Sequence, residues 1–386
     1  MQAIWTSLQK IGLRLARPDI LFWVLPLMMA LLILGTVAQK NIGLYAAQEE
    51  YFGSFYTWIG PKTFTIPIPA GLTIMGIFLV NLTCKFLFRS EWSWQRSGSI
   101  LSHFGVLLLV FGGVMTALTS QEGFLMVGQG DQSNIVEDYH SRNLVVYDTE
   151  GRPFVTIPHE NLHDALRIEL PTMPVTLTID KYCFNCSISM RPQSEQEGWH
   201  SPGNRMMLNK APADSTDEKN LTGIEFTING AKDEDINGKY LTFVGFPKPP
   251  VLDIDDEQTI TIELERAKRP LPFAVKLIRF ERDMHPGTDM ASAYTSWIKI
   301  IDEETGNNFP AKIEMNEPLR YRGFTLYQSS FDLNGDKPHT VLAVVNNKGR
   351  IFPYLASLII ALGLIIHLVI RLTGLKKSTH KEEAAR

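Results

Sequence analysis

Two histidines interrupt long apolar runs near opposite ends of the chain. His103 lies in SHFGVLLLVFGG and His367 lies in ALGLIIHLVIRL. Ionisable side chains are rare in such runs and usually mark a pathway or a ligand site. A neutral imidazole is the usual proximal ligand of haem iron, so the two residues predict axial ligation of a haem within a helix bundle. The structural alternative is that each imidazole hydrogen-bonds to a neighbouring helix.

Cys183 and Cys186 form a CxxC pair in the sequence CFNC. Ser187 follows the pair, where covalent attachment of c-type haem would need a histidine. The surrounding residues alternate as in a strand, and positions i and i+3 of an extended strand lie about 10 Å apart on opposite faces. We therefore expect the two sulfurs to be too far apart for a disulfide bond. A redox role is the less favoured hypothesis, because a reactive CxxC thiol is activated at a helix N-terminus.

No other catalytic motif is present in the sequence. It has no phosphate-binding loop, HExxH, GxSxG or dinucleotide fingerprint. His159 and His163 have the i, i+4 spacing of a metal pair on a helix, but the segment IPHENLHDALRI is short and we favour a structural role. We expect no acid–base residue in this chain.

Four apolar runs are long enough to cross a membrane, because about 20 helical residues span its hydrocarbon core. They cover residues 20–38, 66–88, 99–119 and 352–372. Loops rich in Lys and Arg face the cytoplasm. Such residues precede the first run (Lys10, Arg14, Arg17), separate the second from the third (Lys85, Arg89, Arg96) and follow the fourth (Arg371, Lys376, Lys377). Both termini are therefore predicted inside, and His103 and His367 lie at similar depth, about 6 Å from the cytoplasmic edge.

Between the third and fourth runs, apolar and polar residues alternate over short stretches, as in half-buried strands. Examples are 143–147, 175–179, 259–264, 274–280, 294–301 and 325–328. The fold class is thus a membrane protein with four transmembrane α-helices and a large all-β extracytoplasmic domain between helices 3 and 4. The predicted boundaries are a cytoplasmic N-terminus (1–19), helix 1 (20–38), an outer loop (39–65), helix 2 (66–88), a cytoplasmic loop (89–98), helix 3 (99–119), the β-rich domain (120–351), helix 4 (352–372) and a cytoplasmic tail (373–386).

The composition of the 386 residues excludes several classes of protein. The formal net charge is −4, whereas a nucleic-acid-binding protein carries a basic stripe. Three cysteines are too few for a disulfide-rich secreted scaffold. Four spans with a large outer domain and no inverted repeat also disfavour a small-solute transporter.

The segment NEPLRYRGFTLYQSSFD at 316–332 resembles the ResB/CcsB family of cytochrome c biogenesis proteins, one half of system II. The stretches HPGT at 285–288, ILGTVAQKN at 33–41 and SHFGVLLLVFGG at 102–113 are similar to the same family. From the residues alone, 316–332 predicts a turn fixed by Pro318, then a strand in which Gly323 permits a positive φ. A packed structural corner is the favoured interpretation of this segment.

The resemblance implies a subunit that works with a ResC/CcsA-type membrane protein in the inner (cytoplasmic) membrane. Together they would carry haem b to the outer, periplasmic face and present it to apocytochrome c, with a thioredoxin-like reductant as a further candidate partner. His103 would be a ligand of the haem iron, opposite a histidine of the partner, whereas His367 as a second ligand rests on depth alone. The chain would not be a haem lyase by itself, because the tryptophan-rich haem-handling segment belongs to the partner. The alternative is a membrane-anchored β-domain scaffold that docks apocytochrome or a reductant and binds no haem.

Overall fold

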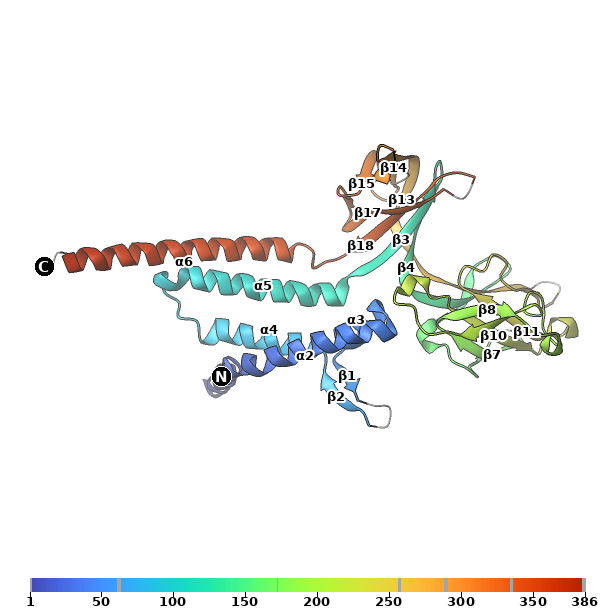
Figure 1. Ribbon diagram of the computed structural model, residues 1–386, viewed down its shortest axis with the longest axis horizontal. Helices are drawn as coiled ribbons and strands as arrows, with labels where there is room; N and C mark the ends of the chain where they lie inside the picture. The colour runs from blue at the N-terminus through green and yellow to red at the C-terminus, as the bar shows by residue number, and fades with distance from the viewer. Residues whose placement is uncertain are drawn as a thin grey trace.

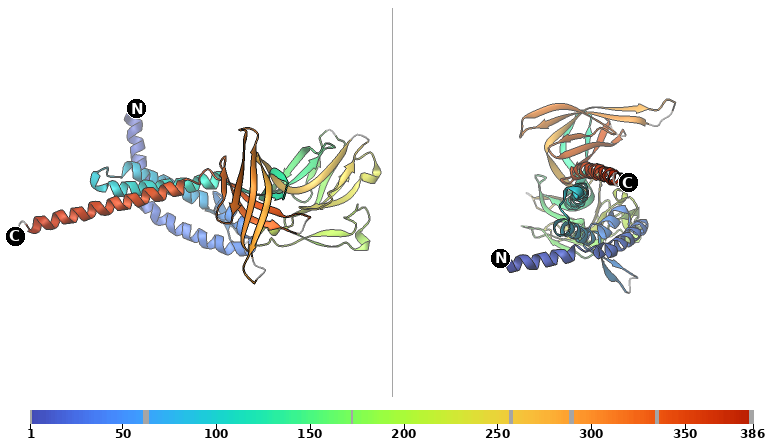
Figure 2. Two further views of the ribbon diagram at one scale, coloured as in Figure 1. Left: turned by 90° about the horizontal axis from the view of Figure 1, so that it is seen from above. Right: turned by 90° about the vertical axis from the view of Figure 1, so that its left-hand side faces the viewer.

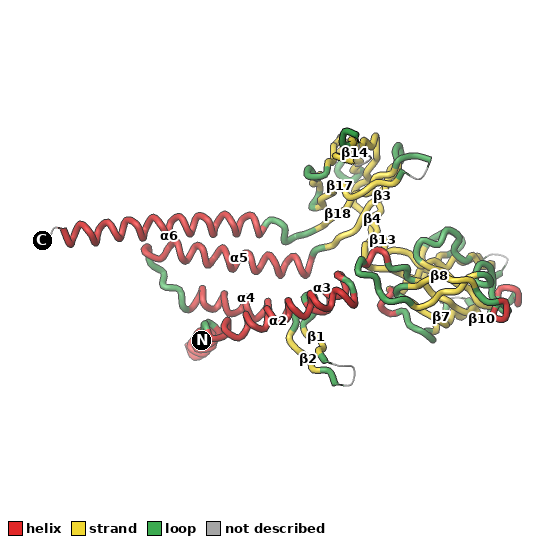
Figure 3. Tube along the Cα trace, viewed as in Figure 1, coloured by secondary structure: helices red, strands yellow, loops and turns green. Residues whose placement is uncertain are grey.

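The computed structural model describes residues 2–60, 64–171, 173–255, 258–287, 291–333 and 336–383, with side chains between residues 9 and 373. The molecule is elongated, with the long helices at one end and the β-rich part at the other (Figure 1). Figure 3 shows that helix and strand are almost completely segregated between these two ends. Thr288 of the HPGT stretch and the last three residues of the predicted tail lie outside the described residues.

Among the described residues, four helices are long and apolar enough to span a membrane, which agrees with the predicted number. They are α2 (Asp19–Ile42), α4 (Gly71–Phe88), α5 (Ser97–Thr119) and α6 (Phe352–Glu383). The helix α2 continues beyond the predicted limit at residue 38, and α6 continues beyond residue 372 into the polar stretch expected to be a tail. Residues 66–69, which we expected to begin the second span, instead form a strand, because Pro67 and Pro69 cannot donate the hydrogen bonds of a helix.

Glycines bring α5 and α6 into close contact. Gly98, Gly105 and Gly112 recur every seven residues on α5, and all three are buried. A Cβ at Gly98 would lie 2.3 Å from the backbone nitrogen of His367, and one at Gly105 would lie 3.0 Å from the carbonyl oxygen of Ala356. Because these positions carry no side chain, the two backbones approach closely enough for van der Waals packing to hold the helices together in an apolar medium.

The N-terminal helix α1 (Gln2–Leu15) runs crosswise to the long helices (Figure 2). The Asn81 side chain on α4 donates hydrogen bonds to the Leu15 and Arg17 carbonyls at 2.6 and 3.0 Å. Gly12 faces the ring of Phe88. These contacts fix α1 at the end of the helix bundle that is remote from the strands.

The predicted outer loop folds into regular structure. It contains α3 (Leu44–Tyr51) and a hairpin of β1 (Tyr56–Ile59) and β2 (Ile66–Pro69). The hairpin exposes Tyr56 and Trp58. Aromatic side chains of this kind are typical of a membrane–water interface.

The β-rich part contains sixteen of the described strands in three sheets, and every strand pairing is antiparallel. The ten-stranded sheet has the order β15-β14-β13-β4-β3-β18-β17-β16, with β12 beside β13 and β5 beside β4. Its strands are β3 (Gln121–Gly128), β4 (Gln132–Tyr147), β5 (Pro153–Pro158), β12 (Val251–Asp253), β13 (Thr259–Met284), β14 (Ala291–Asp302), β15 (Asn307–Glu314), β16 (Leu319–Tyr321), β17 (Phe324–Asp332) and β18 (His339–Asn346).

Two smaller sheets complete this part of the chain. The first has the order β11-β10-β7-β6, from β6 (Arg167–Glu169), β7 (Thr176–Cys183), β10 (Gly223–Asn229) and β11 (Gly238–Phe243). The second pairs β8 (Cys186–Met190) with β9 (Met206–Lys210). The six stretches predicted from alternation coincide with β4, β7, β13, β14 and β17, and a large β-rich domain is confirmed.

Among the described residues, the domain has two large hydrophobic cores that share strands, besides a small cluster around Leu208. The first core lies between the four-stranded sheet and one part of the large sheet, and it includes Phe226 and Ile262. The second core lies within the rest of the large sheet and includes Val275 and Ile298. Strand β13 contributes Ile262 to the first core and Val275 to the second, so one strand passes through both.

We expect Gly98→Ala to destabilise the helix pair by about 1–3 kcal/mol, the usual cost of overpacking a filled contact. The added Cβ would lie 2.3 Å from the His367 nitrogen and 2.6 Å from the Gly363 oxygen, both of which are backbone atoms. Thermal unfolding of the purified chain in detergent measures the effect. Gly76→Ala on α4 is the matched control, because nothing lies within 4 Å of its added Cβ. Equal unfolding temperatures for the two variants would contradict the close contact.

Candidate functional site

His103 lies on α5 with an exposed side chain. Its Nδ1 lies 2.7 Å from the carbonyl oxygen of Ser99, one turn earlier. A carbonyl can only accept, so Nδ1 carries a proton in this contact, and in the neutral imidazole this leaves the lone pair on Nε2. A histidine that binds a metal commonly donates its other ring N–H to a backbone carbonyl in this way, which fixes the tautomer and the ring orientation.

His367 lies in a different environment, on the face of α6 that packs against α5. Its backbone nitrogen is opposite Gly98, five residues or about 7.5 Å along α5 from His103. The Nδ1 atom is buried and has no hydrogen-bond partner within the described part of the chain. The two histidines therefore lie near the same end of the helix pair, but only the His103 side chain is exposed.

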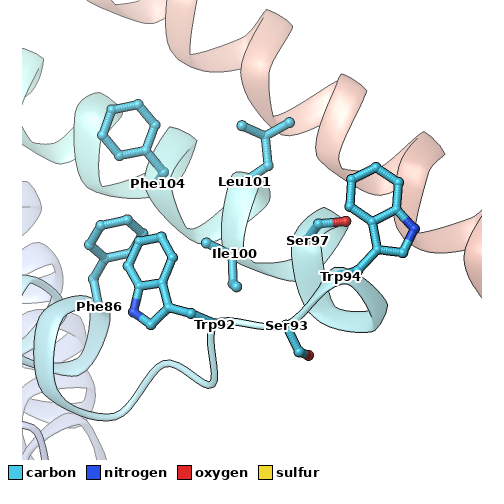
Figure 4. Close-up of a pocket in the computed structure, with 8 residues that line it drawn as sticks. All are labelled: Phe86, Trp92, Ser93, Trp94, Ser97, Ile100, Leu101 and Phe104. Atoms are coloured by element: carbon cyan, nitrogen blue, oxygen red, sulfur yellow. The ribbon is translucent and has the colours of Figure 1, made fainter.

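A cavity of about 480 Å³ opens beside this end of α5 (Figure 4). Its walls combine Phe86 of α4, Trp92 and Trp94 of the connecting loop, and Ile100 and Phe104 of α5. Two serines, Ser93 and Ser97, are the polar residues of the lining. The cavity was not predicted from the sequence, because it depends on how α4 packs against α5.

The donor set suits a haem iron better than a bare metal ion. No group of three His, Cys, Asp or Glu side chains that could hold a metal ion occurs among the described residues. A porphyrin supplies four nitrogens itself and needs only axial ligands, and the Nε2 of His103 can be one of them. The His103 side chain is exposed, whereas the His367 side chain is only partly exposed and its Nδ1 is buried, so His103 is the more accessible imidazole at this position.

The expectation for Cys183 and Cys186 was wrong, because the two residues form a disulfide. Strand β7 ends at Cys183 and β8 begins at Cys186, so the chain bends between them and the Cα atoms lie 5.5 Å apart. The side chain of Asn185 fixes this bend by accepting from the Leu221 amide and donating to the Pro212 carbonyl. Both cysteines are buried beside Leu208. The disulfide is therefore shielded from solvent, which favours a structural role.

One polar cluster was not predicted from the sequence. Tyr45 stacks on His140, and His140 hydrogen-bonds to Asp217. These residues come from three segments that are far apart in the chain, and no sequence motif connects them. His159 and His163, by contrast, form no metal pair: His159 is half-buried beside Arg142, and His163 is exposed and bonds to the Asp164 carbonyl.

The segment 316–332 forms a packed corner, as expected. Strand β16 leads through Arg322 and Gly323, both at positive φ, into β17. The Tyr321 hydroxyl donates to Asp302 at 2.7 Å and the Arg322 guanidinium contacts the same carboxylate at 3.1 Å. Asp302 has no exposed surface, so this carboxylate ties β16 and the following turn to the end of β14.

A second buried network lies further along β17. The Gln328 side chain accepts from Ser296 at 2.6 Å and donates to Thr340 at 3.1 Å. These three side chains come from β17, β14 and β18 and are all buried. Because each group has partners, the network fixes the relative position of the three strands without a nucleophile–base pair.

Comparison with known proteins identifies the class to which this region is similar. Residues 254–353, from the end of β12 to the start of α6, match the ResB-like family. The predicted resemblance is therefore confirmed, and the structural corner at 316–332 lies within the matched region.

Three known proteins match this chain over stretches of 100 to 115 residues. NrfI of Wolinella succinogenes is 33% identical over 100 residues, which cover 26% of this chain and 11% of NrfI. The cytochrome c biogenesis protein CcsB of one Prochlorococcus marinus strain is 33% identical over 115 residues, and that of another strain is 32% identical. Each of these matches covers 29% of this chain and 23% of the CcsB protein. The matched part thus spans less than a quarter of any of these relatives.

We expect Asp302 to make the stability of the β-rich domain depend on pH in the acid range. Burial alone would raise the pKa of this carboxyl, but hydrogen bonds from Tyr321 and from the Thr305 amide lower it to about 2. A carboxyl with a lowered pKa in the folded state stabilises the fold above about pH 4, its unfolded value, and this contribution is lost as the pH falls toward 2. Unfolding followed by tryptophan fluorescence at pH 7 and pH 3 measures the difference.

In the Asp302→Asn variant this pH dependence should be smaller and the protein less stable at pH 7. The matched control is Glu303→Gln, which neutralises the adjacent exposed carboxyl. If the free energy of unfolding falls by the same amount in both variants between pH 7 and pH 3, Asp302 is not the group that makes the stability depend on pH.

Proposed function

We propose that this chain is a ResB-like subunit in cytochrome c biogenesis, where it helps to move haem across a membrane and present it to apocytochrome c. The names of the CcsB relatives support the process, and four apolar helices joined to a large β-rich domain support a multi-pass membrane subunit. The observation that carries the haem step is His103, an imidazole with its Nδ1 held by a backbone carbonyl on an exposed helix face.

The membrane is the inner, cytoplasmic membrane in this proposal, with both termini in the cytoplasm. Exposed basic residues at the helical end, including Arg14, Arg89 and Arg96, favour this orientation. The disulfide between Cys183 and Cys186 favours it as well, because disulfides persist in oxidising compartments such as the periplasm.

Haem b is the transported substrate, and His103 is its ligand near the cytoplasmic side. The aromatic cavity between α4 and α5 offers an apolar surface at the same end of α5, on a helix face that does not include His103. Of the two histidines predicted as ligands we favour His103, because its side chain is exposed whereas the Nδ1 of His367 is buried. His367 contributes to the helix contact in this proposal and remains a second candidate ligand.

A ResC/CcsA-type membrane protein is the proposed partner. One open imidazole cannot complete both axial positions of an iron, so the second ligand comes from the partner. Covalent attachment also belongs to the complex, since no acid–base pair is found in the corner at 316–332. A thioredoxin-like reductant is a further candidate partner, because the client cysteines must be reduced before thioethers form.

A second candidate function has its own support. The ResB-like match covers 254–353, which contains strands of the β-rich domain but neither His103 nor His367. A scaffold that docks apocytochrome or a reductant through this domain, and binds no haem itself, fits that distribution.

The absorption spectrum of the purified complex separates the two candidates. We expect His103→Ala, in the chain co-expressed with its partner, to lose the low-spin b-type signal and to regain it with added imidazole. His367→Ala is the matched control and should keep the signal. If wild type and His103→Ala carry equal haem with the same spectrum, the scaffold is the correct function.

A further inference from the structure

Strand β14 extends beyond the strand that pairs with it on one side. Its neighbour β15 ends at Glu314, which lies opposite Thr295. Strand β14 begins earlier, at Ala291, and its first residues pair with β13 on their other side. Within the described part of the chain, residues 291–294 therefore form a sheet edge with no strand beside it.

The chain turns sharply after β15, and this turn shows which backbone groups face the open edge. Glu314 and Glu317 exchange two hydrogen bonds, in which each amide donates to the other carbonyl at 3.2 Å. The backbone groups of Glu314 thus point away from β14, so those of Thr295 opposite point to β13. Because successive residues of a strand face opposite neighbours, the N–H and C=O of Tyr294 point to the open edge.

A cavity of about 520 Å³ lies along this edge. Ser292, Ala293 and Tyr294 line one side of it, and residues 314–317 of the turn line the end at which β15 stops. Four residues of extended chain are about 13 Å long. The lining places the cavity where a further strand, in line with β15, would lie.

The open edge lacks the features that normally prevent the addition of a strand. Sheet edges are commonly protected by lysine, by proline or by an inward-facing charge. Strand β15, the outer strand of the same sheet, carries Pro310 and Lys312. Residues 291–294 have the sequence ASAY and contain no charged residue or proline. The segment beside the cavity is therefore open to strand addition, whereas the edge next to it is protected.

An exposed aromatic side chain lies on the sheet face next to this edge. Trp297 is 36% exposed, and the cationic groups of Arg279 and Lys312 lie 5.6 and 5.3 Å from its ring. Its Nε1 donates to Glu281 at 3.0 Å, so the ring has a fixed orientation. Tryptophan and arginine are enriched among the residues that dominate protein–protein binding. The surface next to the edge thus suits a polypeptide partner.

The turn gives the cavity a negatively charged end. Glu314 forms an ion pair with Lys312, whose hydrogen bond holds the pKa of the Glu314 carboxyl below its usual value. Glu317 is exposed and adds a second carboxylate, so the two acids outnumber the one lysine beside them. A basic side chain of a bound segment would complement this charge.

The edge is accessible in the folded molecule. Strand β14 lies at the margin of the β-rich part, on the opposite side from α2 and α4, as two views of the molecule show (Figure 1, Figure 2). The segment also lies within residues 254–353, the part of the chain that matches the ResB-like family. A partner can therefore reach this edge without contacting the helices.

We propose that residues 291–294 bind an extended segment of the apocytochrome as an added strand, with a basic side chain of that segment beside Glu317. This inference rests on the proposed function, in which an apocytochrome is the client. A client without haem lacks the group around which its core forms, so extended segments remain available for pairing. Main-chain hydrogen bonds supply the affinity in this mode of recognition, and side chains supply the selectivity.

The test is the binding of apocytochrome c to the purified full chain in detergent. The probe is a fluorescently labelled apocytochrome c with alkylated cysteines, and binding is followed by fluorescence anisotropy. Tyr294→Pro removes the N–H that faces the edge but no hydrogen bond to β13, a position at which a sheet tolerates proline. Tyr294→Phe is the matched control, because it keeps the backbone and the ring contact with Phe331.

A second variant leaves the backbone of the edge unchanged. Glu317→Lys reverses the charge at the end of the cavity, and Glu303→Lys is its control at another exposed carboxyl of the domain. We expect Tyr294→Pro and Glu317→Lys each to weaken binding about tenfold, which corresponds to the loss of one hydrogen bond or ion pair. Both controls should bind like wild type.

The inference is overturned if Tyr294→Pro binds as tightly as Tyr294→Phe, or if Glu317→Lys binds as tightly as Glu303→Lys. The proposed function would survive that result, because the client would still bind elsewhere on the chain. If wild type binds no apocytochrome, the inference and the proposed client both fail, and the spectrum of His103→Ala still tests the haem step. Self-association that Tyr294→Pro abolishes would show that a second copy of the chain occupies the edge instead.

Discussion

The contact between α5 and α6 is the constraint on which the rest of the molecule depends. Both helices connect to neighbouring strands: one residue separates α5 from β3, and five residues separate β18 from α6. Strands β3 and β18 pair from Gln121↔Asn346 onward, so the helix pair continues into a strand ladder as one antiparallel unit. A shift of one helix along the other would have to be matched by a shift of that ladder, which would turn every inward side chain outward. The glycines of α5 therefore set the register of the central strands as well as the spacing of two helices.

Much of this architecture could be predicted from the sequence, because its signals are local. Apolar runs of about 20 residues have few alternatives to membrane helices, and alternation identified strands such as β4 and β14. The start of α4 was misplaced because residues 66–70 are as apolar as a span, and only the prolines in IPIP distinguish a strand there. The position of His103 was also predictable, but its exposure was not, since that depends on which face of α5 meets α6.

The features that escaped prediction depend on contacts between distant segments. The bend at Asn185, which brings Cys183 and Cys186 together, is held by Leu221 and Pro212. The cluster at His140 needs Tyr45 from α3 and Asp217 from the short helix η4 (Asp217–Lys219), and none of the three belongs to a sequence motif. Nothing in a single sequence places such residues together, so the contacts of His140 could not be predicted.

The passage of β13 through both hydrophobic cores affects how the β-rich domain unfolds. Ile262 and Val275 lie on one continuous strand, and β4 accompanies it from Val136 in the second core to Leu144 in the first. The part around one core cannot unfold while the part around the other holds β13 and β4 in place, because both strands contribute buried side chains to both cores. The two halves should thus unfold as one cooperative unit, and a partner that tightens one half makes the other more rigid without touching it.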